Sequence, residues 1–315
     1  MNAPIASWRA PLNSRRLEHF LAVYEHRSFG RAASVVHVSQ PALSKSIQLL
    51  EEELGVQLFE RATSGVLPTI YGEALAGHAK VIQAEMKNAA REIATLSGAD
   101  SGEVLIGATP SVAADLLPRV FEALQKLRPG IRLQVIEGLM EDHIPALRRG
   151  ELDVFVGGWA SDAHPDLATK LIMRDQIRIF AAADHPLAGK NAIALPDLLT
   201  YPWILPPPTQ FWIDQVMQIF VSSGLTPPVP HAVANSAGFI KAVLLQKDFL
   251  SALPARLLCG EVAGDSIVAI DVKELSVSVN ITATYRRQAI RLSAFEVFMK
   301  LLTDVGQKLT VAARA

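Results

Sequence analysis

The feature that most constrains this chain is a stretch near its start, residues 28–47, with the sequence SFGRAASVVHVSQPALSKSI. It predicts two short helices joined by a tight turn at His37-Val38. Ser28 and Ser39 are placed to cap these helices, because a serine hydroxyl accepts a hydrogen bond from a free N–H of the first helical turn. Pro41 is tolerated there because that N–H has no partner within the helix. The stretch therefore predicts a helix-turn-helix unit.

Apolar residues at helical spacing lie on both sides of this turn. They are Leu17, Phe20, Leu21 and Tyr24 before it, and Leu43, Ile47, Leu50 and Leu54 after it. Each set predicts one buried stripe on a helix, and Gly55 provides a stop for the second helix. The opposite face holds the hydrogen-bonding side chains Gln40, Ser44, Lys45 and Gln48. Such side chains read bases or hold phosphates, although a solvated three-helix bundle has the same pattern.

A small β-hairpin is expected directly after these helices. Residues 58–61 and 66–69 flank the turn-forming residues Thr63, Ser64 and Gly65. Next to a helix-turn-helix, such a hairpin would be a wing that follows the DNA backbone or the minor groove.

From about Ser14 to Gly77 the sequence resembles the LysR-type transcriptional regulators. The residues that carry the resemblance are Phe20, Ser28, Phe29, Ala32, Ala33, Ser39, Gln40, Pro41, Ala42, Leu43, Ser44, Ile47, Leu50, Glu51, Leu54, Gly55, Leu58, Phe59, Arg61, Thr69 and Gly72. The resemblance implies a winged helix-turn-helix domain over residues 1–72 that binds double-stranded promoter DNA. Pro68 departs from the family pattern, which more often has Leu there, and this departure concerns only the end of the wing.

The residues expected at the DNA lie on the polar face and beside it. They are Ser39, Gln40, Pro41, Ser44, Lys45 and Gln48 at the major groove, with Arg31 and Arg61 on phosphates. The whole chain has a formal net charge of -1, and residues 1–72 hold seven basic against six acidic residues. DNA binding therefore cannot depend on a large uniform positive field. It requires local clustering of the basic residues and several copies of the domain.

A heptad pattern follows the wing and offers a way to bring copies together. Its members alternate in steps of four and three: Leu75, Ala79, Ile82, Met86, Ala89, Ile93 and Leu96. This spacing is typical of a coiled-coil seam, although a long helix packed on its own domain shows it too. We interpret residues 73–102 as a dimerising linker helix, which the family also has, ending in a small, Gly-rich hinge at residues 97–102. The resemblance adds a homotetramer as the expected assembly.

From residue 103 onward strands and helices alternate. Strands are expected at residues 104–108, 131–136, 152–156, 177–182 and 277–285, and helices at 116–127, 141–149 and 291–302. This order predicts an α/β fold with a parallel sheet. By resemblance, residues 103–312 form a two-lobed effector-binding domain like periplasmic binding proteins, with the inducer between the lobes. Lobe I is expected over residues 103–175 and 281–312, and lobe II over residues 176–280.

Short polar groups follow several of these strands, where α/β sheets bind ligands beside helix N-termini. The residues expected at the effector are Thr109, Ser111, Gly158, Trp159, Gln210 and Ser236. Each polar one taken alone is better explained as a helix cap, and it is their joint placement at equivalent ends of both lobes that makes a ligand site an equal alternative.

Residues 201–208, YPWILPPP, resemble the branch of the family that controls aromatic-acid or sugar catabolism. In that branch a Gly and then an Arg follow the prolines. Here Thr209, Gln210, Phe211 and Trp212 follow, and no basic residue occurs before Lys241. The sequence therefore favours a neutral, sugar-like or aromatic effector, and control of a catabolic or transport operon.

Catalytic signals are weak. The eight histidines show no metal-ligand spacing, and no phosphate-binding glycine motif is present. Cys259 is expected to pack as a small apolar residue. We therefore expect no enzyme activity, catalytic residue, metal or cofactor. A solute-binding protein would leave the helix-turn-helix unexplained, and an enzyme using the cleft and Cys259 would lack a base. No apolar run approaches the ~20 residues that span a bilayer, and a single cysteine fits a reducing cytosol, so a cytoplasmic location is expected.

Overall fold

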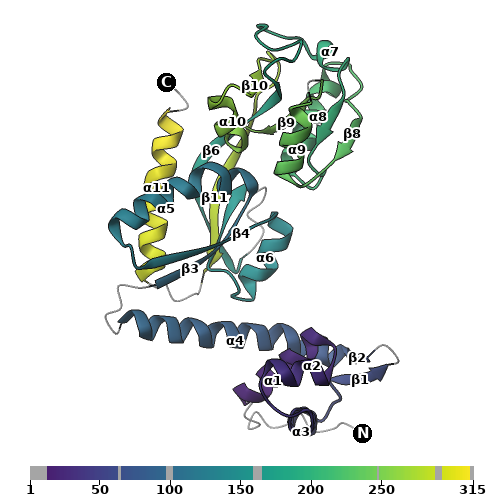
Figure 1. The fold of residues 1–315 in the computed structure, drawn as a ribbon, viewed down its shortest axis with the longest axis vertical. Helices are drawn as coiled ribbons and strands as arrows, with labels where there is room; N and C mark the ends of the chain where they lie inside the picture. The colour runs from purple at the N-terminus through teal and green to yellow at the C-terminus, as the bar shows by residue number, and fades with distance from the viewer. Residues whose placement is uncertain are drawn as a thin grey trace. The chain divides into compact units, whose positions relative to one another are not determined.

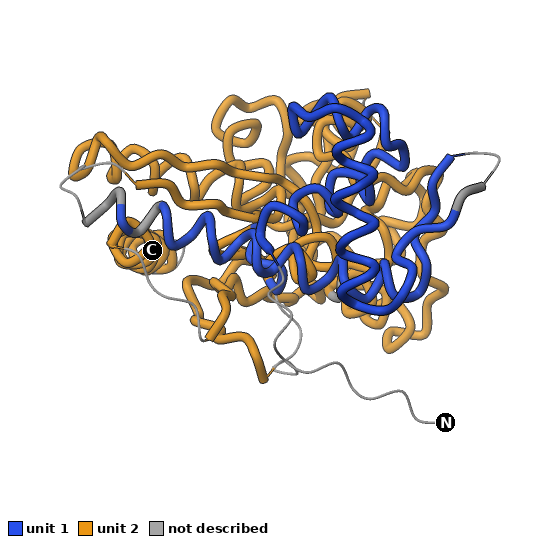
Figure 2. Tube along the Cα trace, turned by 90° about the horizontal axis from the view of Figure 1, so that it is seen from below, with its two compact units in different colours: residues 1–93, 148–151 blue, residues 94–147, 152–315 orange. Residues whose placement is uncertain are grey.

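The computed structural model describes residues 13–62, 65–96, 102–158, 165–246, 248–287 and 293–312. The chain divides into two compact units (Figure 2). Unit 1 comprises residues 1–93 with 148–151, and unit 2 comprises residues 94–147 with 152–315.

Unit 1 contains the expected helix-turn-helix. Its elements are α1 (Ser14–His26), α2 (Phe29–Val35), α3 (Gln40–Leu54), β1 (Phe59–Ala62), β2 (Gly65–Pro68) and α4 (Ile70–Leu96). Ser28 and Ser39 accept hydrogen bonds from the N–H groups of Arg31 and Ala42, as their cap positions predict. Gly55 ends α3 in the left-handed conformation, at φ 69°. The two apolar stripes face inward and form one core with the wing and the start of α4.

The wing is an antiparallel pair, in which Phe59 lies opposite Pro68 and Ala62 opposite Gly65. Glu51 of α3 connects it to the helices. The Glu51 carboxylate accepts hydrogen bonds from the N–H groups of Leu58 at 2.7 Å and Phe59 at 3.2 Å. These amides would otherwise lack a partner at the start of the hairpin, so Glu51 fixes where the wing leaves the helical core.

The heptad positions of α4 behave in two ways. Leu75, Ala79 and Ile82 pack against the core of unit 1. Met86 and Ile93, further along the same seam, are 53% and 66% exposed. The first part of the seam therefore packs on its own domain, and only the later part presents apolar side chains to another chain.

Unit 2 is built on one seven-stranded sheet, with the order β10-β6-β11-β5-β3-β4 and with β9 paired to β6 (Figure 1). The strands are β3 (Gly102–Ala108), β4 (Ile131–Glu137), β5 (Val154–Gly158), β6 (Leu167–Ala182), β9 (Ser251–Pro254), β10 (Ile267–Ile270) and β11 (Val277–Arg286). β3 pairs in parallel with β4 and β5, as the sequence pattern predicts. β6 and β11 run antiparallel and extend from one lobe into the other.

The helices of the first lobe are a π-helical turn η1 (Val112–Leu116), α5 (Leu117–Leu127), α6 (Met140–Arg148) and α11 (Ser293–Ala312). The second lobe has a separate parallel pair, β7 (Trp203–Leu205) and β8 (Pro230–Val233). Its helical segments are α7 (Leu195–Leu198), α8 (Phe211–Ser222), α9 (Ala237–Leu244), η2 (Ala255–Leu258) and α10 (Cys259–Ala263). The architecture is thus α/β and two-lobed, with lobes that share two long strands (Figure 1).

Three predicted elements differ in extent. β6 begins at Leu167, ten residues before the expected strand at residue 177, because β11 pairs with it throughout residues 167–177. The helix expected from residue 116 is preceded by η1. The last helix continues to Ala312, well beyond the expected end at residue 302. No helix among the described residues is long and apolar enough to cross a membrane.

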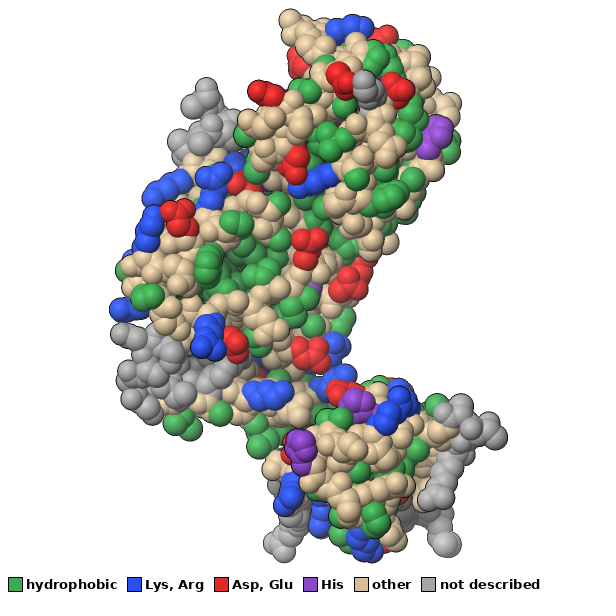
Figure 3. Space-filling view, viewed as in Figure 1, with side chains coloured by type: hydrophobic (Ala, Val, Ile, Leu, Met, Phe, Trp, Pro, Cys, Tyr) green, Lys and Arg blue, Asp and Glu red, His purple; other side chains and the backbone are tan. Residues whose placement is uncertain are grey.

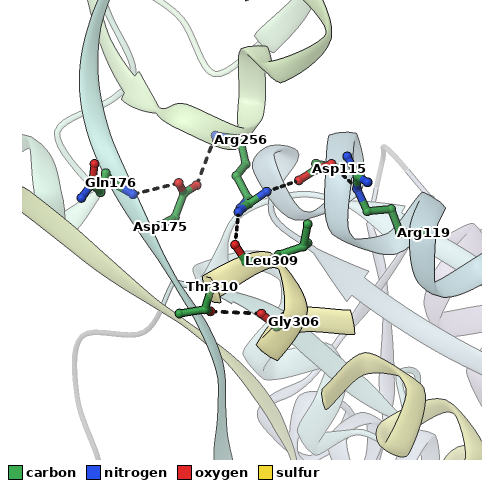
Figure 4. A network of polar contacts seen from close by, with 8 residues as sticks. All are labelled: Asp115, Arg119, Asp175, Gln176, Arg256, Gly306, Leu309 and Thr310. Atoms are coloured by element: carbon green, nitrogen blue, oxygen red, sulfur yellow. Dashed lines mark hydrogen bonds and ion pairs between the residues drawn. The ribbon is translucent and has the colours of Figure 1, made fainter. Parts of the chain in front are cut away.

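A polar network joins η1, β6, η2 and α11 (Figure 4). Asp115, which is 4% exposed, accepts hydrogen bonds from Arg119 at 2.7 Å and Arg256 at 2.6 Å. The Arg256 guanidinium also donates to the carbonyl of Leu309 at 2.9 Å. Burial acts to raise the pKa of Asp115, but the hydrogen bonds from the two arginines outweigh it and hold that pKa below its ordinary value.

Candidate functional site

The exposed face of α3 is the candidate nucleic-acid surface of unit 1. Gln40, Pro41, Ser44, Lys45 and Gln48 are all exposed. The opposite face of the helix is buried, through Leu43, Ile47 and Leu50. The side chains expected at DNA are therefore free to contact it, except that the Ser39 hydroxyl is used as the cap of this helix.

The basic residues beside this face are few. Arg31 is exposed on α2. On α3, the Lys45 ammonium donates a hydrogen bond to the Gln48 side-chain oxygen at 3.4 Å, so Lys45 and Gln48 lie together at the centre of the α3 face. Arg61 lies on β1, but its side chain falls outside the described residues. On the face seen in Figure 3, acidic and basic side chains lie interspersed among the described residues, in keeping with the balanced charge.

Two contacts that orient α3 were missed by the sequence reasoning. His19 Nδ1 of α1 lies 2.8 Å from the Ser46 hydroxyl, and Arg16 pairs with Glu53. Burial is the main cause that lowers the pKa of His19, with the charge of Arg15 adding to it, and both effects favour the neutral ring. Both contacts join side chains on different helices, which no local periodicity reveals.

The candidate ligand site is a pocket between the two lobes of unit 2. The empty space there is about 870 Å³, a figure that includes open solvent at its mouth. The first lobe lines it with Thr109, Pro110, Ser111, Leu139, Met140, Glu141 and Gly158. The second lobe contributes Pro206, Pro207, Thr209, Gln210, Trp212, Ala234, Asn235, Ala237 and Ile240. Leu253, Pro254, Leu257, Val279 and Ile281 complete the wall from β9, η2 and β11.

Thr109 is held at the end of β3 by its backbone. Its N–H donates to the Val156 carbonyl at 3.1 Å, and its own carbonyl accepts from Val112 and Ala113. Its methyl group lies against Gly157, where a Cβ would come within 2.6 Å of it, so only glycine fits there. The Thr109 hydroxyl is buried and has no hydrogen-bond partner. A buried hydroxyl without a partner is unfavourable and marks a place where a ligand can supply the missing bond.

The structure brings four of the six expected effector residues into one pocket: Thr109, Ser111, Gly158 and Gln210. It does not bring Ser236 into the lining. The Ser236 hydroxyl accepts from the Phe239 N–H at 3.2 Å and caps α9, while the neighbouring Asn235 lines the pocket. Trp159 lies outside the described residues.

Several lining residues were not among the six expected at the effector. Asn235 directly precedes Ser236, Trp212 follows Gln210 by two positions and Glu141 begins a predicted helix, so their position beside strand-to-helix loops was a usable signal. Leu253, Leu257, Val279 and Ile281 give no such signal, because buried aliphatic residues in strands normally indicate only a core.

The chemistry of the pocket is that of a binding site. Among the described lining residues Glu141 is the sole charged side chain, and no Lys, Arg or His lines the pocket. No group of three or more His, Cys, Asp or Glu among the described residues could hold a metal ion. Cys259 is half-buried, and burial raises the pKa of its thiol, which disfavours the reactive thiolate.

A helix-turn-helix unit with an open polar face, followed by a two-lobed α/β domain with a pocket between its lobes, defines a ligand-responsive regulator of transcription. The comparisons agree with this class. The family signature described as "Bacterial regulatory helix-turn-helix protein, lysR family" matches residues 14–73, and "LysR substrate binding domain" matches residues 97–307. The chain belongs to the LysR family of bacterial transcriptional regulators.

Individual relatives are named as regulators of transcription. The HTH-type transcriptional regulator PcaQ of Agrobacterium fabrum is 27% identical over 298 residues, which covers 90% of this chain and 96% of the relative. The DNA-binding transcriptional dual regulator OxyR of Escherichia coli is 30% identical over 259 residues, covering 82% and 84%. Full-length CbnR, solved in complex with its target DNA, shares the fold at a TM-score of 0.71 with 21% identity, covering 93% of this chain and all of that one.

Proposed function

We propose that the α3 face reads an operator in the promoter DNA, and that the pocket between the lobes holds the small-molecule effector. The observation that carries the first part is the exposure of Gln40, Ser44, Lys45 and Gln48 above a fully buried stripe. The observation that carries the second is the unpartnered, buried Thr109 hydroxyl in a pocket lined from both lobes.

Two copies of the chain pair through the exposed later part of the α4 seam, centred on Met86 and Ala89. Both residues are exposed, and apolar side chains at heptad spacing gain stability by packing against the same seam of a second helix. A tetramer, formed by further contacts between effector domains, is the assembly that the family resemblance adds. A pair of chains would contact DNA through two helix-turn-helix domains, and so make more contacts than one domain of low net charge can make alone.

Effector binding acts on the lobes. Because β6 and β11 connect the lobes as continuous strands, a ligand that contacts both lobes favours the arrangement in which both sets of contacts are made. A chain that acts on promoter DNA works in the cytoplasm. The controlled genes belong to a catabolic or transport operon, as the resemblance implies.

A redox role like the one named for some relatives is less well supported. Several relatives are called "Hydrogen peroxide-inducible genes activator". This sequence has one cysteine, so it cannot form an internal disulfide, and burial disfavours the thiolate of Cys259. Protein treated with peroxide should therefore keep its DNA affinity.

The proposed function is tested by a gel-shift titration of the purified chain with DNA from upstream of its own gene. We expect binding to that DNA at protein concentrations that leave random DNA of equal length unshifted, with a steep decrease as salt rises. Equal affinity for both DNAs would contradict operator recognition. An effector-like compound should raise the melting temperature, since a ligand that binds only the folded state stabilises it.

A further inference from the structure

The side chains that line the pocket indicate which class of effector it can bind. This inference rests on the proposed function, in which the pocket is the effector site. We propose that the pocket takes a small, largely apolar and uncharged molecule, such as an aromatic alcohol or amide. On this proposal it does not take a carboxylate or a sugar.

The largest part of the lining is apolar. Trp212, Ile240, Leu253 and Leu257 are buried around the pocket, together with Val279 and Ile281 of β11. A ring or short aliphatic body is favoured there because it removes apolar surface from water. A sugar carries hydroxyls around its whole perimeter, and those facing these walls would lose water without gaining a protein partner. The sugar-like alternative is therefore disfavoured.

The charged side chains of the lining also disfavour an anionic effector. A carboxylate buried in a protein needs a cation or several hydrogen-bond donors. Among the lining residues that the structure describes, none is basic and Glu141 alone is charged, and its carboxylate would repel a second one. The first turn of α8 follows Gln210, and the N–H of Ile213 there already donates to the Gln210 carbonyl at 2.8 Å. Other N–H groups of that turn would serve a hydroxyl or carbonyl oxygen as well as an anion.

The polar groups present are suited to a neutral partner. Thr109 and Ser111 offer hydroxyls from the first lobe, and Gln210 and Asn235 offer amides from the second. Each can donate or accept a hydrogen bond. A single alcohol or amide on the ligand could complete the bond that the Thr109 hydroxyl lacks while its apolar body contacts β11 and η2.

The test uses full-length protein and four soluble probes, three of which share one ring. They are 2-phenylethanol, phenylacetamide, phenylacetate and glucose. Saturation-transfer NMR with titration should give dissociation constants for the two uncharged ring compounds at least ten-fold lower than for phenylacetate, and no binding of glucose. Phenylacetate or glucose binding as tightly as the alcohol would overturn the ligand class, yet leave the pocket as the effector site. Failure of all four probes to bind would also contradict the proposal.

Two variants locate the effect. Ala237→Phe fills the pocket from its half-buried lining position, and it should weaken binding of the uncharged probes ten-fold or more. Unchanged binding would show that the probes bind elsewhere, which contradicts both this inference and the assignment of the pocket. Glu141→Gln removes the like charge, and it should tighten phenylacetate binding a few-fold without affecting 2-phenylethanol. The matched control Glu137→Gln, exposed on β4 and outside the lining, should change neither.

Discussion

Asp175 shows how one buried residue makes stability depend on pH. It lies on β6 and accepts hydrogen bonds from the N–H groups of Gln176 at 2.8 Å and Arg256 at 3.4 Å (Figure 4). Burial outweighs these bonds and raises the pKa of Asp175 to about 6. Its charged form is therefore less favourable in the folded chain than in the unfolded chain. The free energy of unfolding that Asp175 contributes should fall as pH rises from about 4 through about 6.

The comparison of wild type with Asp175→Asn isolates this effect, because the variant cannot ionise. A two-unit shift at ~1.4 kcal/mol per unit corresponds to about 3 kcal/mol in total, part of which is already lost at pH 4. Between pH 4 and pH 7 the wild type should therefore lose roughly 2 kcal/mol of unfolding free energy relative to the variant. Urea titrations at each pH measure the difference. A difference that stays constant, or that changes in the opposite direction, would show that Asp175 does not carry the raised pKa.

Ser44 is the residue on which base recognition is most simply tested. It is exposed at the centre of the α3 face, and its replacement disturbs no buried group. Ser44→Ala should weaken binding to the preferred DNA by roughly 1–3 kcal/mol if the hydroxyl contacts a base, and far less on random DNA. The control Ser14→Ala, exposed at the start of α1, should leave both affinities unchanged. Equal losses on both DNAs would make Ser44 a phosphate contact or a general one.

Some features of single residues could be predicted from the sequence, and others could not. Ser28, Ser39 and Gly55 were placed correctly because caps depend only on neighbouring residues. Ser236 and Asn235 were not distinguished, since which of the two faces the pocket depends on where α9 begins. The pair Arg256–Asp115 joins residues 141 positions apart, and no local pattern contains that information.

At the scale of elements, the first part of the α4 seam packs on unit 1, and the later part is exposed and is proposed to contact a second chain. The part at Ile82 packs on unit 1, so an acidic substitution there would disturb the fold as well as any dimer. Met86→Asp changes an exposed seam position instead. It should weaken dimerisation at least ten-fold by placing an unpaired carboxylate in an apolar interface, with little change in melting temperature.

Sedimentation velocity over a range of concentrations measures this effect, together with the affinity for operator DNA. Lys87→Asp is the control, because it lies one position further along and is turned away from the seam. If Met86→Asp keeps the wild-type mass at every concentration, the exposed seam is not the dimer interface.

The strands show why element boundaries were harder to predict than element types. The alternation over residues 277–285 predicted β11 well, because Val277, Val279 and Ile281 are buried and alternate with exposed residues, although Thr282 and Thr284 further along are buried too. In β6 the residues before position 177 include Lys170, Arg174 and Asp175, which read as a loop. They form a strand because β11 pairs with β6 from Leu167 to Ile177, a contribution from a segment at least a hundred residues away.

For the whole molecule, we expect that a substitution in the pocket can weaken the response to effector without lowering the stability of the fold. Thr109→Val removes a buried hydroxyl that has no partner, at nearly constant volume. Its melting temperature should therefore equal or exceed that of the wild type, and operator binding without effector should be unchanged. The response of a promoter–reporter fusion to the compound that induces the wild type should nevertheless weaken several-fold, because the proposed ligand loses its hydrogen bond to this hydroxyl.

For Ser236→Ala we expect the opposite pair of results, which are lower stability and unchanged induction. Ser236 caps α9 outside the pocket lining, and loss of this cap should destabilise the chain by about 1 kcal/mol. The induction ratio should stay at the wild-type level. Suppose instead that Thr109→Val lowers the melting temperature and leaves induction intact, while Ser236→Ala abolishes induction. The sensing contact would then lie at the start of α9, and the unpartnered hydroxyl of Thr109 would have only a structural role.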